Sequence, residues 1–188
     1  MSKRKRLIYI PLGGSGEIGM NLYLYGYGVP GREDFILVDA GVSFPNMDTT
    51  PGVDLIMPDI SFVKENIERL LGIFITHGHE DHVGALGYLF SNISKPVYCR
   101  EFTAALAARK LSKVEKIDER IITVESLPET VDVGAFRVGF LPVSHSIPEA
   151  CSLVIDTPIG RVLHTGDFKI DETPVLGDPF NYDHLSEI

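Results

Sequence analysis

The chain has 188 residues, 44% of them hydrophobic, and a formal net charge of −9 at pH 7. That length suits one domain with a sizeable core, and no stretch approaches the ~18 consecutive apolar residues of a membrane span. The acidic balance argues against a broadly basic nucleic-acid-binding surface without excluding a phosphate-bearing substrate. The two cysteines, Cys99 and Cys151, lack C-x-x-C spacing, which favours a reducing cytoplasm over a disulfide-stabilised setting.

A glycine-rich loop follows the first predicted strand, Leu7–Leu12. Residues 14–19 read G-x-G-x-x-G, and Asp39 follows at about the 20-residue spacing of the acid in a dinucleotide-binding fingerprint. That fingerprint requires a helix directly after the last glycine. Here the alternating pattern of Asn21–Tyr27 predicts a strand instead. We therefore expect the loop to join two strands and to bind no dinucleotide.

The rest of the chain alternates between strand-like and helix-like patterns. Further strands are predicted at Phe35–Val38, Ile73–Thr76, Val97–Cys99, Ile121–Val124, Ala135–Val143, Cys151–Ile155 and Arg161–His164. Helices are predicted at Ile60–Leu71, His82–Phe90 and Glu101–Lys116. In the last of these, the spacing places Phe102, Ala105, Leu106 and Arg109 on one face. The order of elements favours an α/β (α+β) fold, with a mixed sheet and flanking helices.

Four potential metal ligands lie within six residues after the predicted strand Ile73–Thr76. The segment H-G-H-E-D-H contains His77, His79, Asp81 and His82, and imidazole and carboxylate groups are the usual ligands of zinc at neutral pH. Two histidines at i and i+2 of an extended segment point to the same side, and the following Asp-His pair can face a second point. A polar loop with Asp81 as a helix N-cap is the alternative, but it leaves three of the six histidines unexplained.

Two more candidates follow later strands, His145 in L-P-V-S-H-S and Asp167 in H-T-G-D. Taken alone, a histidine at a strand end more often makes a structural hydrogen bond, and an aspartate after Thr-Gly is usually a turn residue. Beside the central cluster, they supply a third ligand for one metal and a bridging carboxylate. His164 lies within a strand pattern, and we expect it to pack or to support a ligand.

The order of these segments resembles the metallo-β-lactamase superfamily: a strand-end aspartate, H-x-H-x-D-H, a distant histidine and a distant aspartate. Within it, the chain is similar to the ribonuclease J family of the β-CASP branch. The similar segments are GGSGEIGMN, VDAGVSFP, PGVDLIMPDISF, GIFITHGHEDHVGAL, PVSHSIPEA and HTGDFKID. This resemblance implies that residues 1–188 are the N-terminal portion of an αββα sandwich domain, without its second half and without the β-CASP insertion.

The resemblance also implies how the ligands are shared. It assigns His77, His79 and His145 to a first zinc. Asp81 and His82 are assigned to a second zinc, and Asp167 bridges the two. A hydroxide would lie between the metals, and manganese or magnesium could replace zinc. The catalytic carboxylates would be Asp81 and Asp167, while the family's general acid lies outside this chain. Asp39 would orient a ligand without binding metal.

The activity implied by the resemblance is metal-dependent RNA hydrolysis, exonucleolytic from the 5′ end or endonucleolytic, in RNA processing, including that of rRNA, and in RNA decay. Paired metals suit phosphodiester hydrolysis because they activate water and stabilise the charge that develops on the phosphate. The implied setting is cytoplasmic, with RNA as partner, no membrane and self-association left open for the longer chain. We expect this portion alone to be weakly active or inactive. The alternatives are another hydrolase of the same fold, acting on a thioester or lactone, and a truncated metal-binding domain without turnover.

Overall fold

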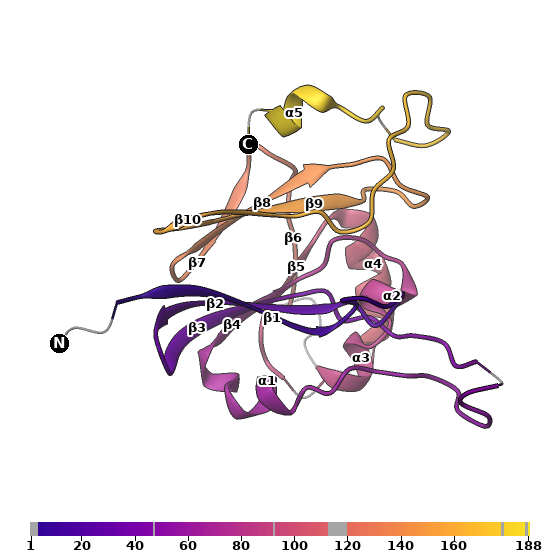
Figure 1. Ribbon diagram of the computed structural model, residues 1–188. Helices are drawn as coiled ribbons and strands as arrows, with labels where there is room; N and C mark the ends of the chain where they lie inside the picture. The colour runs from indigo at the N-terminus through magenta and orange to yellow at the C-terminus, as the bar shows by residue number, and fades with distance from the viewer. Residues whose placement is uncertain (1–3, 47, 92, 113–119, 178, 187) are drawn as a thin grey trace.

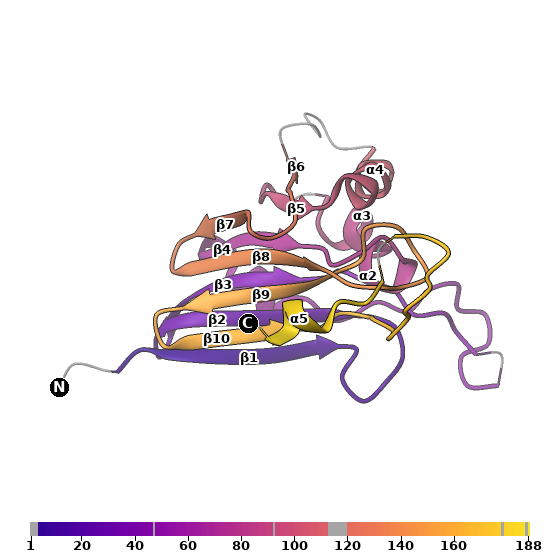
Figure 2. The same cartoon turned by 90° about the horizontal axis from the view of Figure 1, so that it is seen from above.

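Two β-sheets packed face to face form the centre of the structure (Figure 1). The computed structural model describes residues 4–46, 48–91, 93–112, 120–177, 179–186 and 188. The larger sheet has the strand order β1-β2-β3-β4-β5-β6, and the smaller has the order β10-β9-β8-β7. Seen from above, β8, β9 and β10 run along β1 to β4 (Figure 2), as expected of aligned sheets.

The six strands of the larger sheet are β1 Arg6–Gly13, β2 Leu22–Val29, β3 Arg32–Val38, β4 Leu70–Phe74, β5 Val97–Cys99 and β6 Ile121–Thr123. The smaller sheet contains β7 Thr130–Val133, β8 Phe136–Pro142, β9 Cys151–Thr157 and β10 Gly160–His164. The helices are α1 Ser61–Glu65, the 3₁₀ helix η1 Ile67–Arg69, α2 Glu80–Val83, α3 Leu86–Leu89, α4 Glu101–Lys110 and α5 Tyr182–Ser186. The first three strands pair antiparallel and β3 to β6 pair parallel, which confirms the mixed sheet predicted from the sequence.

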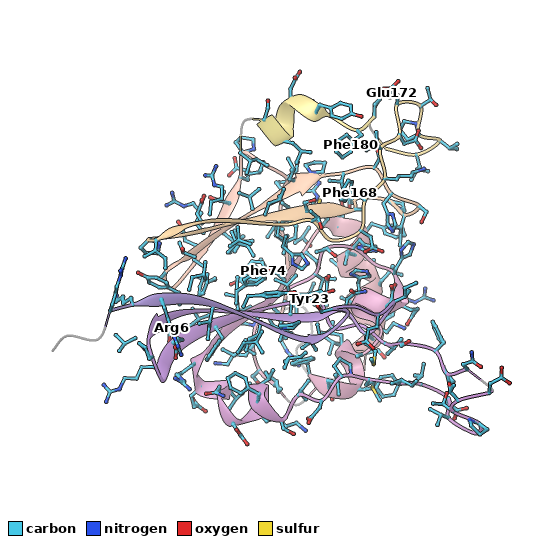
Figure 3. The ribbon with its side chains drawn as sticks, viewed as in Figure 1. Arg6, Tyr23, Phe74, Phe168, Glu172 and Phe180 are labelled. Atoms are coloured by element: carbon cyan, nitrogen blue, oxygen red, sulfur yellow. The ribbon has the colours of Figure 1, made fainter. Side chains whose placement is uncertain are left out.

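Each face of the larger sheet carries its own hydrophobic cluster, and β3 contributes to both. Phe35 and Leu37 face α1, α3 and α4, whereas Ile36 and Val38 face the smaller sheet. Successive side chains of a strand point to opposite faces, so a strand buried on both sides reads as the continuous apolar run F-I-L-V. Phe74 lies between the sheets (Figure 3). Within the described residues, no helix is both long enough and apolar enough to cross a membrane.

The helices are shorter than their sequence patterns predict. The helix expected over Ile60–Leu71 is divided into α1, which ends at Glu65, and η1, and it cannot reach Leu71 because Leu70 already belongs to β4 and is buried in the sheet. Burial in a sheet overrides a local helical pattern. The helix expected over His82–Phe90 is divided into α2 and α3, and α4 ends at Lys110, although part of the prediction falls on residues 113–119, outside the described residues.

The buried face of α4 also differs from the predicted one. Thr103, Ala104 and Ala107 are buried, while Phe102 is 38% exposed. The small side chains let α4 pack closely, and a Cβ on Gly87 of α3 would lie only 2.2 Å from a carbonyl oxygen at the end of α4. Close approach therefore decides which face is buried. The strand β7 was not predicted; it has four residues at the edge of the smaller sheet, none of them fully buried.

Backbone hydrogen bonds connect the glycine loop, the segment after β3 and α2. The Asn21 amide donates to the Asp81 carbonyl oxygen at 3.0 Å. The Ala40 amide donates to the His82 carbonyl oxygen at 2.7 Å, and the Gly41 amide donates to the Asn21 carbonyl oxygen at 2.9 Å. A Cβ on Gly41 would lie 1.6 Å from the Asp81 carbonyl oxygen. The three segments therefore form one frame that has no room for a side chain at residue 41.

We expect Gly41→Ala to lower the free energy of unfolding by at least about 3 kcal/mol, the upper end of ordinary overpacking costs, because a backbone carbonyl must move. Urea denaturation of the metal-free chain measures this. Gly52→Ala is the matched control: φ is +78° there and nothing lies within 4 Å of the added Cβ, so only backbone strain of about 1–2 kcal/mol is expected. Equal losses for the two variants would contradict the close packing at Gly41.

Candidate metal centre

The candidate ligands come from the ends of strands that reach the same edge of the two sheets (Figure 1). His77 and His79 follow β4 and lead into α2, which carries Asp81 and His82. The smaller sheet supplies the other two, because His145 follows β8 and Asp167 follows β10. The structure thus brings all six predicted ligands to one place, with both sheets contributing.

Three histidines form a first group. Nδ1 of His79 lies 3.1 Å from Nε2 of His77 and 3.2 Å from Nε2 of His145. The ligand atoms of this group all lie within 4.8 Å of one another. Nitrogens bound to one zinc at about 2 Å have separations of this size, so these three side chains have the spacing of a shared metal site.

A second group lies beside the first and consists of His77, His82 and Asp167, again within 4.8 Å. Nε2 of His82 lies 3.5 Å from one Asp167 oxygen and 3.6 Å from Oδ2 of Asp81. The other Asp167 oxygen lies 3.9 Å from Nε2 of His145. Asp167 therefore lies between the two groups, as a bridging carboxylate must. Asp81 contacts His82 but lies outside the closest group. His77 belongs to both groups, which the sequence did not predict.

Asp39 is fully buried behind the ligands. Its carboxylate accepts hydrogen bonds from the Thr76 amide at 2.8 Å and from the Thr76 hydroxyl at 3.0 Å. It also accepts a hydrogen bond from Nδ1 of His82 at 2.8 Å. The backbone of Asp39 is left-handed, with φ at +61°, a conformation that aspartate adopts more readily than most residues. This position fits the predicted role of orienting a ligand without binding metal.

These hydrogen bonds also decide which ring nitrogens are free. His82 donates through Nδ1 to Asp39, which leaves Nε2 facing Asp167. The Thr76 hydroxyl donates to Asp39, so it can accept the proton on Nδ1 of His77 at 3.0 Å. Nε2 of His77 then presents its lone pair to the first group. One carboxylate thus sets the tautomers of two candidate ligands.

The charges of the groups follow from burial and from the same contacts. Burial, assisted by the neighbouring His82, lowers the pKa of His77 to about 3. Burial would also lower the pKa of His82, but the adjacent Asp39 carboxylate outweighs it and raises that pKa to about 10. The hydrogen bond with His82 lowers the pKa of Asp167 to about 2. Without metal, His82 therefore carries a proton, and binding an ion there must displace it.

Two residues beside the site were not singled out from the sequence. The Asn21 side-chain nitrogen lies 3.1 Å from the Asp81 carbonyl oxygen and 3.0 Å from Nε2 of His82, and the Tyr23 hydroxyl donates to Oδ1 of Asn21 at 2.7 Å. Asn21 directly precedes β2 and Tyr23 is the second residue of that strand, so both follow the glycine loop. The one sequence signal was a polar residue between that loop and an apolar strand.

The glycine loop joins β1 and β2, as predicted, and lies against this pair. Gly14 has φ at +78°, and a Cβ there would lie 2.3 Å from the Tyr23 hydroxyl oxygen. Only glycine suits this position, because the turn needs a positive φ and the Tyr23 hydroxyl comes too close for a side chain. His164 packs against two tyrosines of β2: Nδ1 is 3.0 Å from the Tyr25 hydroxyl, and the rings of His164 and Tyr23 are 4.9 Å apart. Packing is one of the two roles that the sequence predicts for it.

Comparison with known proteins gives a family. A model of the metallo-beta-lactamase superfamily matches residues 19–188. A ribonuclease J from Sinorhizobium meliloti is 49% identical over 177 residues, which cover 94% of this chain and 31% of that protein. Ribonucleases J from Corynebacterium glutamicum and Synechocystis are 40% and 36% identical, covering 93% and 99% of this chain but 24% and 29% of their own lengths. The chain thus spans less than a third of each of these relatives.

Solved structures share the fold at low identity. A protein of unknown function from Enterococcus faecalis V583 has a TM-score of 0.61 at 20% identity, covering 88% of this chain and 44% of its own. CmlA, a diiron β-hydroxylase from Streptomyces venezuelae, has a TM-score of 0.55 at 19% identity, covering 87% of this chain and 30% of its own. Since the family model matches all but the first 18 residues, the chain belongs to the metallo-β-lactamase superfamily.

Proposed function

We propose that the chain forms the metal-binding part of a metal-dependent ribonuclease that hydrolyses phosphodiester bonds of RNA. The observation that carries the proposal is the position of Asp167, with one oxygen 3.5 Å from His82 and the other 3.9 Å from His145. A carboxylate shared between two neighbouring ligand groups suits a pair of metal ions. Relatives named ribonuclease J, up to 49% identical, support RNA as the substrate class.

The donor set fits a pair of zinc ions, and manganese or magnesium remain alternatives for the same nitrogens and oxygens. His77, His79 and His145 would hold one ion; Asp81 and His82 would hold the other; Asp167 would hold both. When bound, such a pair lowers the pKa of water and stabilises negative charge on a phosphate. Asp167, shared by both ligand groups, would hold the two ions next to each other, and the carboxylates of Asp81 and Asp167 would orient the water that the metals activate.

The same proposal covers the setting of the activity. Residues 1–188 would be the N-terminal portion of a metallo-β-lactamase domain, acting on RNA in the cytoplasm as part of a longer protein. Cys99 and Cys151 are free and buried, and the absence of a disulfide between them suits a reducing compartment. Burial raises the pKa of both thiols to about 12. Exonuclease and endonuclease action, and self-association of the longer protein, stay predictions.

The activity is testable in a chimera. These 188 residues replace the matching segment of the Sinorhizobium meliloti relative, and cleavage of a labelled single-stranded RNA is measured with zinc or manganese added. We expect metal-dependent cleavage that falls by several orders of magnitude on His77→Ala, because that residue faces both ligand groups. The parent protein is the positive control. A folded chimera that binds metal and hydrolyses a thioester or lactone, but not RNA, would refute the ribonuclease proposal.

The two ions should bind unequally to the 188-residue chain. Three histidines and Asp167 give the first ion four protein ligands, a complete tetrahedral shell, whereas Asp81, His82 and the shared Asp167 give the second only three. Competition titration with a chromophoric chelator should therefore resolve one tight zinc and one weaker zinc. His145→Ala should remove the tight step, and Asp81→Ala should weaken only the other. Two equally tight steps would contradict this assignment.

Stability of the metal-free chain should fall as the pH rises from about 6.5, the ordinary pKa of histidine, towards 10. The pKa of His82 is raised to about 10 in the folded chain, so its stabilisation is complete below the unfolded pKa and is lost as the pH passes the folded one. Urea denaturation with chelator present, at pH 6.5 and pH 9.5, measures the difference. In Asp39→Asn the difference should shrink; an unchanged difference would rule out this ion pair as its cause.

A further inference from the structure

The side chain of Asn21 is buried beside the candidate metal centre, and its neighbours fix which way its amide group points. Its nitrogen lies 3.1 Å from the backbone carbonyl oxygen of Asp81, which can only accept a hydrogen bond. Its oxygen accepts the hydrogen bond of the Tyr23 hydroxyl at 2.7 Å. Both contacts assign the same orientation, with the NH₂ group towards α2 and the oxygen towards β2.

The NH₂ group has a second hydrogen, and that hydrogen faces the ligands. The Asn21 nitrogen lies 3.4 Å from Oδ2 of Asp81 and 3.0 Å from Nε2 of His82. When an ion is bound to Nε2 of His82, that nitrogen has no lone pair with which to accept a hydrogen bond. The carboxylate of Asp81 is then the one acceptor among these contacts to which the second hydrogen can turn.

We propose that Asn21 and Tyr23 form a positioning pair for the second metal ion: the Tyr23 hydroxyl holds the Asn21 amide, and the amide holds the Asp81 carboxylate beside His82. This inference rests on the proposed metal centre and assigns roles to two residues in it. Neither residue touches the reacting atoms. The pair links the glycine loop to the weaker of the two sites, where ligand orientation matters most because fewer protein ligands are present.

The pair can be separated from the fold because the Tyr23 ring has its own packing. It stacks on Tyr9 with centroids 6.0 Å apart and lies 4.9 Å from His164. Tyr23→Phe therefore keeps the ring and removes only the hydrogen bond to Asn21. Tyr25→Phe is the matched control on the same strand, since it removes a hydroxyl that lies 3.0 Å from His164, which is not a candidate ligand.

The first measurement is zinc affinity of the 188-residue chain by chelator competition. We expect Tyr23→Phe to weaken the second zinc about 10-fold or more, the usual effect of losing a partner that orients a ligand, and to leave the first zinc unchanged within about twofold. Asn21→Ala should weaken the second zinc at least as much. Tyr25→Phe should match the wild type. Equal weakening of both zinc ions by Tyr23→Phe would indicate general structural damage and would overturn the proposal.

The second measurement follows the Asn21 side-chain amide by nuclear magnetic resonance, independently of activity. Zinc should shift both of its proton resonances in the wild type and in Tyr25→Phe, and Tyr23→Phe should change them before metal is added. Zinc binding to the wild type without that shift overturns the positioning role but leaves the metal centre intact. A wild-type chain that binds no zinc would instead refute the proposed function on which this inference rests.

Discussion

The buried carboxylate of Asp39 is the contact on which the rest of the candidate centre depends. A fully buried charge is tolerated only where hydrogen bonds and an opposite charge compensate for lost hydration. Thr76 and His82 provide that compensation. Because Asp39 follows β3, Thr76 follows β4 and His82 lies in α2, the same hydrogen bonds hold the imidazoles of His77 and His82 towards one point. The same hydrogen bonds therefore stabilise the buried Asp39 carboxylate and set the orientation of the candidate ligands.

Much of the site could be predicted because its ligands are concentrated in the sequence. Three histidines and an aspartate within H-G-H-E-D-H have few structural explanations, and the strands before His145 and Asp167 indicated that those residues would reach the same edge. The fold class followed from the same order of strands and helices. What these patterns could not give is the detailed sharing of ligands, such as His77 facing both groups.

The features that the sequence did not predict have a common physical cause. They depend on contacts between residues far apart in the chain, which local sequence patterns do not encode. Asn21 lies 60 residues from Asp81 in the chain, and nothing around Asn21 in the sequence indicates that contact. Leu70 fits a helical pattern but pairs with Phe35 in the sheet. In α4 the helical spacing favoured the larger side chains, whereas packing against α3 selected the alanines.

The centre also lies across the boundary between the two sheets, with His77, His79 and His82 on one side and His145 and Asp167 on the other. An ion bound by ligands from both sides of that boundary would join the two sheets at this edge of the sandwich. Anything that binds only the folded state raises its stability by mass action. Parting the sheets at this edge would then require breaking metal–ligand bonds as well as separating apolar faces such as those of Phe74 and Phe140. Metal binding would thus raise the stability of the packed sheets as well as complete the site.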